Sequence, residues 1–170
     1  MLQTNYKGNF MKRFRKIYLE ISNICNLHCR FCPGTKRVPK ALTDTEFETL
    51  LPKLQPYTDY LYFHLMGEPL CHPRLEHFLH LAGVYNFKVI LTTNGVLLPK
   101  LQPLLLQAPA LHKLNISLHA FEANDLTMSL TNTLMAVFPL AKRPKAKKLS
   151  ATAFGMVVAR MIKTKKSWLP

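Results

Sequence analysis

The chain has few cysteines, few glycines and no long hydrophobic run, and each shortage excludes a class of protein. Four cysteines in 170 residues are too few for a disulfide-dense secreted scaffold. Six glycines exclude a collagen-like chain. No stretch of about 18 residues is free of charged and polar breaks, so no membrane span is expected. Because no apolar run follows the basic N-terminus as in a signal peptide, we expect a cytoplasmic protein.

Acidic residues are missing from the last quarter of the chain. Residues 126–170 hold nine Lys or Arg and no Asp or Glu, whereas residues 1–125 hold fourteen basic and nine acidic residues. The formal net charge is +14. A basic excess favours nucleic acid or an anionic surface as partner. Nucleic acid is therefore a candidate partner of this segment, and a solvated basic tail is the simpler interpretation.

Short apolar segments alternate with helical patterns from about residue 17 to residue 119. Strands are predicted over residues 17–22, 60–66, 88–92 and 114–118. Apolar residues at helical spacing predict helices that begin after Thr43, at Pro73 and at Leu97. Alternating strands and helices imply right-handed crossovers and a parallel sheet, which is an α/β fold. The pattern alone does not decide between a barrel and an open sheet.

Polar and special residues follow each predicted strand at the end where α/β folds gather their chemistry. In strand order, the clusters are Cys25 with Cys29 and Cys32, Gly67-Glu68-Pro69, Thr93-Asn94-Gly95, and Ser117 with His119. Because the strands are parallel, these clusters are expected at one edge of the sheet. The agreement in register indicates one common site.

Three of the four cysteines fall within eight residues, with the spacing C-x3-C-x2-C. Thiolates in a reducing compartment favour zinc or an iron–sulfur centre. A structural zinc site needs a fourth protein ligand, which Cys71, His28 or His72 could supply. Three cysteines without a fourth fit better a [4Fe-4S] cluster with one iron left open. Purely structural cysteines are the remaining alternative.

The cysteine segment resembles the signature of the radical S-adenosylmethionine (radical SAM) superfamily, C-x3-C-x-aromatic-C, with Phe31 in the aromatic position. Gly-Glu-Pro, Thr-Asn-Gly and the fourth strand follow in the family's order. The resemblance covers about residues 15–125 and implies a partial (β/α) barrel. It also implies that Cys25, Cys29 and Cys32 ligate a [4Fe-4S] cluster, whose open iron holds SAM for cleavage to a 5′-deoxyadenosyl radical.

The same resemblance implies a set of SAM-binding residues. In the family, the stretch that corresponds to Gly67-Glu68-Pro69 contacts the methionyl amino group. Phe31 is expected near the adenine, and Ser117 near the ribose or the carboxylate. A functional role is also expected for Asn94. No catalytic residue beyond these is predicted, and Cys71 is interpreted as a loop or packing residue.

Beyond Asp125 the sequence departs from the family pattern. We expect an N-terminal segment (1–14), a partial radical SAM core (15–125) and a basic C-terminal segment (126–170), with a helix over Leu149–Ile162. Four strands followed by loss of the α/β pattern predict a truncated or frame-disrupted barrel, with an unpaired sheet edge.

The leading functional prediction is a radical SAM enzyme or its remnant. The alternatives are a zinc- or cluster-stabilised nucleic-acid-binding module and a non-catalytic cluster-binding scaffold. The sequence leaves the substrate open among a peptide, a cofactor precursor and a nucleotide. A low-potential electron donor such as flavodoxin or ferredoxin is the expected partner, and no membrane partner is expected.

Overall fold

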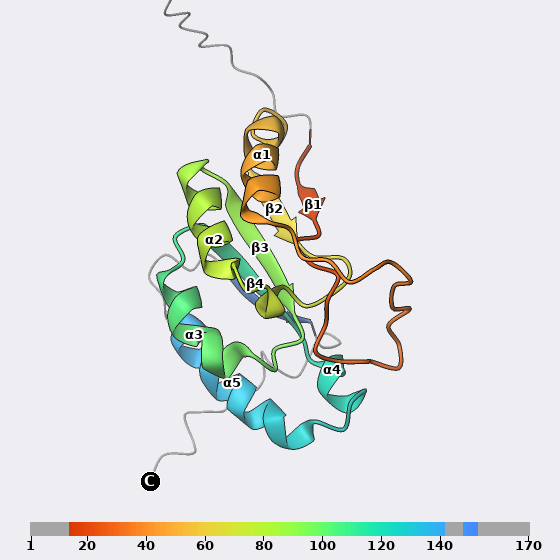
Figure 1. Cartoon of the computed structure of the whole chain (residues 1–170). Coiled ribbons are helices and arrows are strands. Elements are labelled where there is room, and N and C mark those ends of the chain that lie inside the picture. Colours follow the sequence, from red (N-terminus) through yellow and green to blue (C-terminus); the bar gives the residue numbers. More distant parts are fainter. Residues whose placement is uncertain (1–13, 142–147, 153–170) are drawn as a thin grey trace, which may run out of the picture.

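Five parallel strands form an open sheet in the computed structural model, which describes residues 14–141 and 148–152 (Figure 1). The strands are β1 (Ile17–Leu19), β2 (Tyr60–Phe63), β3 (Lys88–Thr93), β4 (Leu111–Ser117) and β5 (Lys148–Thr152). They lie side by side in sequence order, and all neighbouring pairs are parallel. The predicted α/β fold is therefore confirmed as a partial barrel, unclosed within the described residues.

Helices cover one face of this sheet (Figure 1). They are α1 (Asp44–Leu54), α2 (Leu75–Val84), α3 (Leu98–Gln107) and α5 (Thr127–Ala141). A 3-10 turn, η1 (Pro69–Cys71), and a short helix, α4 (His119–Glu122), follow the ends of β2 and β4. Among the described residues, no helix is both long enough and apolar enough to span a bilayer.

The core lies between the sheet and these helices. Alternate residues along each strand face it, so that Leu61 and Phe63 on β2 are fully buried. Phe47 on α1 stacks on Phe78 of α2 at 4.0 Å between ring centroids, and it meets Phe63 edge-on at 5.9 Å. These aromatic contacts fix α1 and α2 against β2.

Helix α1 begins at a capping box. The Thr43 side chain accepts a hydrogen bond from the Glu46 backbone amide, and the Glu46 carboxylate accepts one from the Thr43 amide. Both amides lack a partner within the helix, so the box satisfies two donors at once. The start of α1 ends the cysteine-containing loop that follows β1.

The prediction that the strand–helix alternation ends after β4 was wrong. Helix α5 returns along the sheet, and β5 pairs in parallel with β4 from Lys113 to Ser117. The helix predicted over Leu149–Ile162 was also wrong at its start, since residues up to Thr152 are in β5. The open edge of β4 supplies hydrogen-bond partners that outweigh local helical preference. The remainder of that predicted helix lies outside the described residues.

Candidate functional site

The three motif cysteines lie on a long loop that connects β1 to α1 at the C-terminal edge of the sheet. The two arms of the loop are tied together at its base. Asn23 holds the returning arm with three hydrogen bonds. Its backbone amide donates to Lys40 O (3.0 Å), its Nδ2 donates to Val38 O (2.9 Å), and its Oδ1 accepts from Lys40 N (2.7 Å). The Leu42 amide donates to Ile21 O at 2.8 Å. These hydrogen bonds hold the two arms of the loop together next to the sheet.

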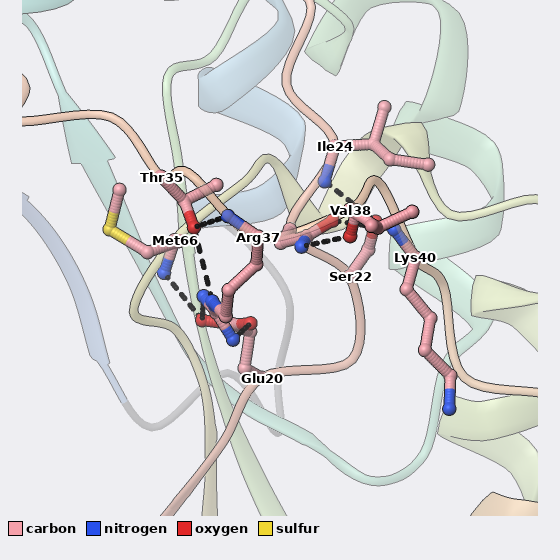
Figure 2. A network of polar contacts seen from close by, with 9 residues as sticks. Glu20, Ser22, Ile24, Thr35, Arg37, Val38, Lys40 and Met66 are labelled. Carbon is pink, nitrogen blue, oxygen red and sulfur yellow. Dashed lines mark hydrogen bonds and ion pairs between the residues drawn. The ribbon is translucent and has the colours of Figure 1, made fainter.

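An ion pair forms a second tie between the arms of the loop (Figure 2). Arg37 forms a bidentate pair with Glu20, at 2.7 Å (Nη1–Oε1) and 2.9 Å (Nη2–Oε2). Glu20 Oε2 also accepts a hydrogen bond from the Met66 backbone amide at 3.1 Å. The Arg37 guanidinium lowers the pKa of the Glu20 carboxyl, so that this group stays ionised. Glu20 thus joins the cysteine loop to the loop that follows β2.

A cavity of about 490 Å³ opens between the cysteine loop and the loop that follows β2. Its lining includes all three motif cysteines and no carboxylate. The lining residues are Asn23, Ile24, Cys25, Leu27, His28, Cys29, Cys32, Gly34, Thr35, Arg37, Pro39, Leu65, Met66 and Gly67. The donor set around the cavity is therefore soft, and the Arg37 guanidinium in its lining is paired with Glu20.

Each motif sulfur accepts a hydrogen bond from an N–H group. Cys25 Sγ accepts from the Leu27 amide at 3.4 Å, and Cys32 Sγ accepts from the Gly34 amide at 3.4 Å. Cys29 Sγ accepts from Asn124 Nδ2 at 3.1 Å. Such bonds orient the sulfurs and stabilise negative charge on them. Among the described residues, no three His, Cys, Asp or Glu side chains are gathered closely enough to hold a single metal ion.

Shielding from solvent raises the pKa of the Cys25 thiol. The N–H of Leu27 opposes this rise, whereas the charges of Glu68 and Cys29 add to it. A thiol must lose its proton to bind a metal, so loading of this residue releases a proton. Cys71 also has a raised pKa, chiefly through burial, and it lies against the Asn26 backbone amide without lining the cavity.

Glu68 is the central acceptor beneath the cavity. It is 2% exposed, and its two carboxylate oxygens accept three hydrogen bonds, from Leu70 N (2.9 Å), Thr93 Oγ1 (2.7 Å) and Asn94 N (2.7 Å). Burial raises the pKa of this carboxyl, and the three hydrogen bonds oppose that rise. Its carboxylate caps η1 and ties the β2 loop to the end of β3. It therefore supports the cavity from behind and does not face into it.

Gly67 brings the β2 loop into the wall of the cavity. Its φ is +78°, and a Cβ at this position would lie 2.3 Å from the Ser22 carbonyl oxygen. Only glycine fits both the conformation and the close approach. The backbone of Met66 and Gly67 is consequently the part of the Gly-Glu-Pro region that lines the cavity.

The other predicted cofactor-binding residues do not line the cavity. Phe31 is 59% exposed on the cysteine loop, and Pro69 is buried in η1. Asn94 is 8% exposed and donates from Nδ2 to Asn26 Oδ1 at 2.8 Å, with Cys25 Sγ at 3.9 Å. Ser117 is half-buried at the end of β4. The predicted roles of these residues toward SAM stay predictions.

One suggested zinc ligand is already occupied by backbone partners. His72 is buried, with Nε2 3.1 Å from Leu42 O, and its Nδ1 accepts from Arg74 N at 3.1 Å. By contrast, His28 lines the cavity beside the cysteines. Sequence reasoning missed Glu20, Arg37 and Asn124, which belong to no motif. Glu20 and Arg37 lie on the cysteine loop itself, whereas Asn124 is brought to it only by the fold. Most of the basic segment lies outside the described residues.

Comparisons with known proteins agree on one family. A model of the radical SAM superfamily matches residues 19–156. A tungsten-containing aldehyde ferredoxin oxidoreductase cofactor-modifying protein of Pyrococcus furiosus is 31% identical over 87 residues, which are 48% of this chain and 24% of that protein.

Solved structures share the fold at low identity. BtrN in complex with AdoMet and 2-DOIA matches with a TM-score of 0.59 at 21% identity, over 83% of this chain and 57% of BtrN. Streptococcus suis SuiB bound to S-adenosylmethionine matches with a TM-score of 0.66 at 18% identity, over 91% of this chain and 38% of SuiB. The chain thus spans little more than half of these structures at most.

Proposed function

The chain belongs to the radical SAM superfamily, and from this premise we propose that Cys25, Cys29 and Cys32 ligate a [4Fe-4S] cluster that holds S-adenosylmethionine at its fourth iron. The observation that carries the proposal is the cavity shared by the three thiols. When bound, the cluster supplies the electron that cleaves SAM to methionine and a 5′-deoxyadenosyl radical. The residues of the chain bind and orient these groups.

The donor set around the cavity fits such a cluster. Thiolates are the ligands of iron–sulfur centres. The lining contains no carboxylate, which is the ligand that a hard cation such as Mg²⁺ or Ca²⁺ prefers. The cluster with three thiolates would be anionic, and no carboxylate lines the cavity to oppose its charge. N–H donors already point at all three sulfurs. These features support an anionic sulfur-ligated group over a structural role for the cysteines.

SAM would meet the opposite wall of the cavity, where the backbone of Met66 and Gly67 lies. A carbonyl oxygen there is a suitable acceptor for the methionyl ammonium group. Glu68 would act through Thr93 and Asn94, which its carboxylate holds in place. Asn94, Phe31 and Ser117 are proposed as further contacts to SAM.

A zinc site is the second candidate, because His28 lines the same cavity as the three cysteines. Three thiolates and one imidazole form a common structural zinc set. The two proposals differ in metal content. Anaerobic loading with both iron and zinc, followed by metal analysis, is expected to give iron with sulfide in the wild-type chain and a loss of iron in each of Cys25→Ser, Cys29→Ser and Cys32→Ser.

Cys71→Ser is the matched control, since Cys71 lies near Cys25 but does not line the cavity. It should retain the iron content of the wild type. Zinc without iron in the wild-type chain would contradict the cluster proposal. Zinc together with salt-sensitive RNA binding would instead support the nucleic-acid-binding alternative, and a cluster without SAM cleavage would support the scaffold alternative.

A cofactor precursor is the proposed substrate class. The support is the relative of 31% identity, whose name describes a cofactor-modifying protein. A low-potential flavodoxin or ferredoxin is the proposed electron donor. Stimulation of SAM cleavage by cofactor precursors, with peptides and nucleotides as the comparison, tests the substrate class.

A further inference from the structure

We propose that Asn124 is a positioning residue that orients Cys29 and sets the reduction potential of the cluster, an inference that rests on the proposed function. Asn124 follows α4 and lies 95 positions from Cys29 in the sequence. Its Nδ2 lies 3.1 Å from Cys29 Sγ. It therefore connects the end of the β4 unit to the cysteine loop.

The hydrogen-bond network fixes which way the Asn124 amide points. Nδ2 also lies 2.7 Å from Ala120 O, and a carbonyl oxygen only accepts. Oδ1 accepts from the His28 backbone amide at 3.3 Å, and an amide N–H only donates. A flipped side chain would place Oδ1 against the Ala120 carbonyl oxygen and Nδ2 against the His28 N–H. The donor therefore faces the sulfur, and one side chain holds both the backbone and the thiol of the His28–Cys29 pair.

Cys29 differs from the other two motif cysteines in the source of its donor. The donors at 3.4 Å to Cys25 and Cys32 are backbone amides of the cysteine loop itself, and they move with it. The other side-chain donor in this group, Asn94 Nδ2, lies 3.9 Å from Cys25 Sγ. Asn124 thus supplies the short donor that comes from outside the loop, so the orientation of the Cys29 sulfur depends on α4.

A hydrogen bond to a cluster sulfur favours the state with more negative charge. Reduction adds an electron to the cluster, so N–H donors at its sulfurs raise the reduction potential. Removal of the Asn124 donor is expected to make reduction harder. An Asp in its place would be nearly isosteric, yet its carboxylate would repel the sulfur instead of donating to it.

The test is the midpoint potential of the reconstituted cluster, measured without SAM by an anaerobic titration that is monitored by electron paramagnetic resonance. Asn124→Asp should give a more negative midpoint than the wild type, and Asn124→Ala should shift it in the same direction by less. Asn86→Asp is the matched control. Asn86 is exposed in the turn before β3, at the opposite edge of the sheet, so the same charge change should leave the midpoint at the wild-type value.

The outcomes separate this inference from the function on which it rests. Iron bound normally with an unchanged midpoint in both Asn124 variants would overturn the role of Asn124 and leave the cluster intact. A wild-type chain that holds no iron would overturn both. Asn124→Ala keeps the question answerable if the Asp variant does not fold, because it adds no charge near the thiols.

Discussion

At the scale of single residues, Gly67 carries the strictest requirement. Its positive φ would strain any other residue, and an added Cβ would overlap the Ser22 carbonyl oxygen. Gly67→Ala is therefore expected to lower the free energy of unfolding by about 1–2 kcal/mol for the backbone conformation and by about 1–3 kcal/mol more for the overlap. Chemical denaturation measures the sum.

Gly34 offers a matched control for this prediction. It also has a positive φ (+64°), but a Cβ there would meet no atom within 4 Å. Gly34→Ala should therefore show only the conformational part, about 1–2 kcal/mol. Equal losses in the two variants would contradict the close approach that places the Met66–Gly67 backbone in the cavity wall.

The residues that line the cavity were easier to predict from the sequence than the contacts that support them. The cysteine spacing and the glycine are local signals, and both lie at the cavity as expected. The role of Glu68 depends on whether its side chain faces the cavity or the core, and the sequence does not encode this locally. Asn124 carries no motif at all, since its partner is 95 positions away.

At the scale of elements, the start of α1 makes the free energy of unfolding depend on pH in the acid range. The hydrogen bond from Lys40, followed by that from the Thr43 amide, lowers the pKa of Glu46 to about 2. Because the folded-state pKa lies below the ordinary value, ionised Glu46 stabilises the fold at neutral pH. This stabilisation is lost as the pH falls through the folded-state pKa.

We therefore expect the difference in free energy of unfolding between the wild type and Glu46→Gln to shrink as the pH is lowered toward about 2. Lys40→Gln should reproduce most of this change, because Lys40 is the largest cause of the lowered pKa. Denaturation curves across the acid range test both variants. A difference that stays constant with pH would show that the carboxylate has no favoured ionised state in the fold.

The tie made by Glu20 gives a prediction about loop dynamics. Glu20→Ala removes the acceptor of the Met66 amide as well as the ion pair, whereas Arg37→Ala removes only the ion pair. If loss of this hydrogen bond lowers the free energy of local opening at Met66 by about 1.4 kcal/mol, the amide exchanges about tenfold faster. Hydrogen exchange at the Met66 amide should accelerate by about this factor in Glu20→Ala and much less in Arg37→Ala.

Arg74→Ala is the control for the Glu20 experiment, since its ion pair with Asp44 involves neither Glu20 nor Met66. It should leave exchange at Met66 unchanged. If Met66 exchanges equally fast in all three variants and in the wild type, the proposed connection between the two loops is wrong.

At the scale of the whole molecule, α5 is part of the packed fold that supports the end of β3. Thr133 is 1% exposed and donates to the Gly95 carbonyl oxygen at 3.1 Å. Thr133→Val keeps the shape but removes one of the two hydrogen bonds that this carbonyl accepts, since the Leu98 amide also donates to it at 3.0 Å. We therefore expect a loss of about 0.5–1.5 kcal/mol in the free energy of unfolding.

The exposed Thr131 on the same helix provides the comparison for Thr133. Thr131→Val should change the free energy of unfolding by no more than about 0.5 kcal/mol. Similar values for the two variants would contradict the packing of α5 against the turn that follows β3.

The overall fold was predictable from the sequence as far as local patterns reach. Strands β1 to β4 are short apolar segments, helices α1 to α3 have apolar residues at helical spacing, and α1 also has a capping box. Strand β5 has no such signal, because its segment is short, follows a run of basic residues and is fixed by pairing with β4. For the same reason, the end of the α/β pattern was expected too early in the chain.

The central claim is that the thiols of Cys25, Cys29 and Cys32 hold a cluster with one iron open to SAM. Its most direct test is the electron paramagnetic resonance spectrum of the anaerobically reconstituted, reduced wild-type chain, recorded with and without SAM. The prediction is a cluster signal that changes when SAM is added, from a protein that holds about four iron atoms per chain. An iron-free chain, or a cluster signal unaffected by SAM, would contradict the claim.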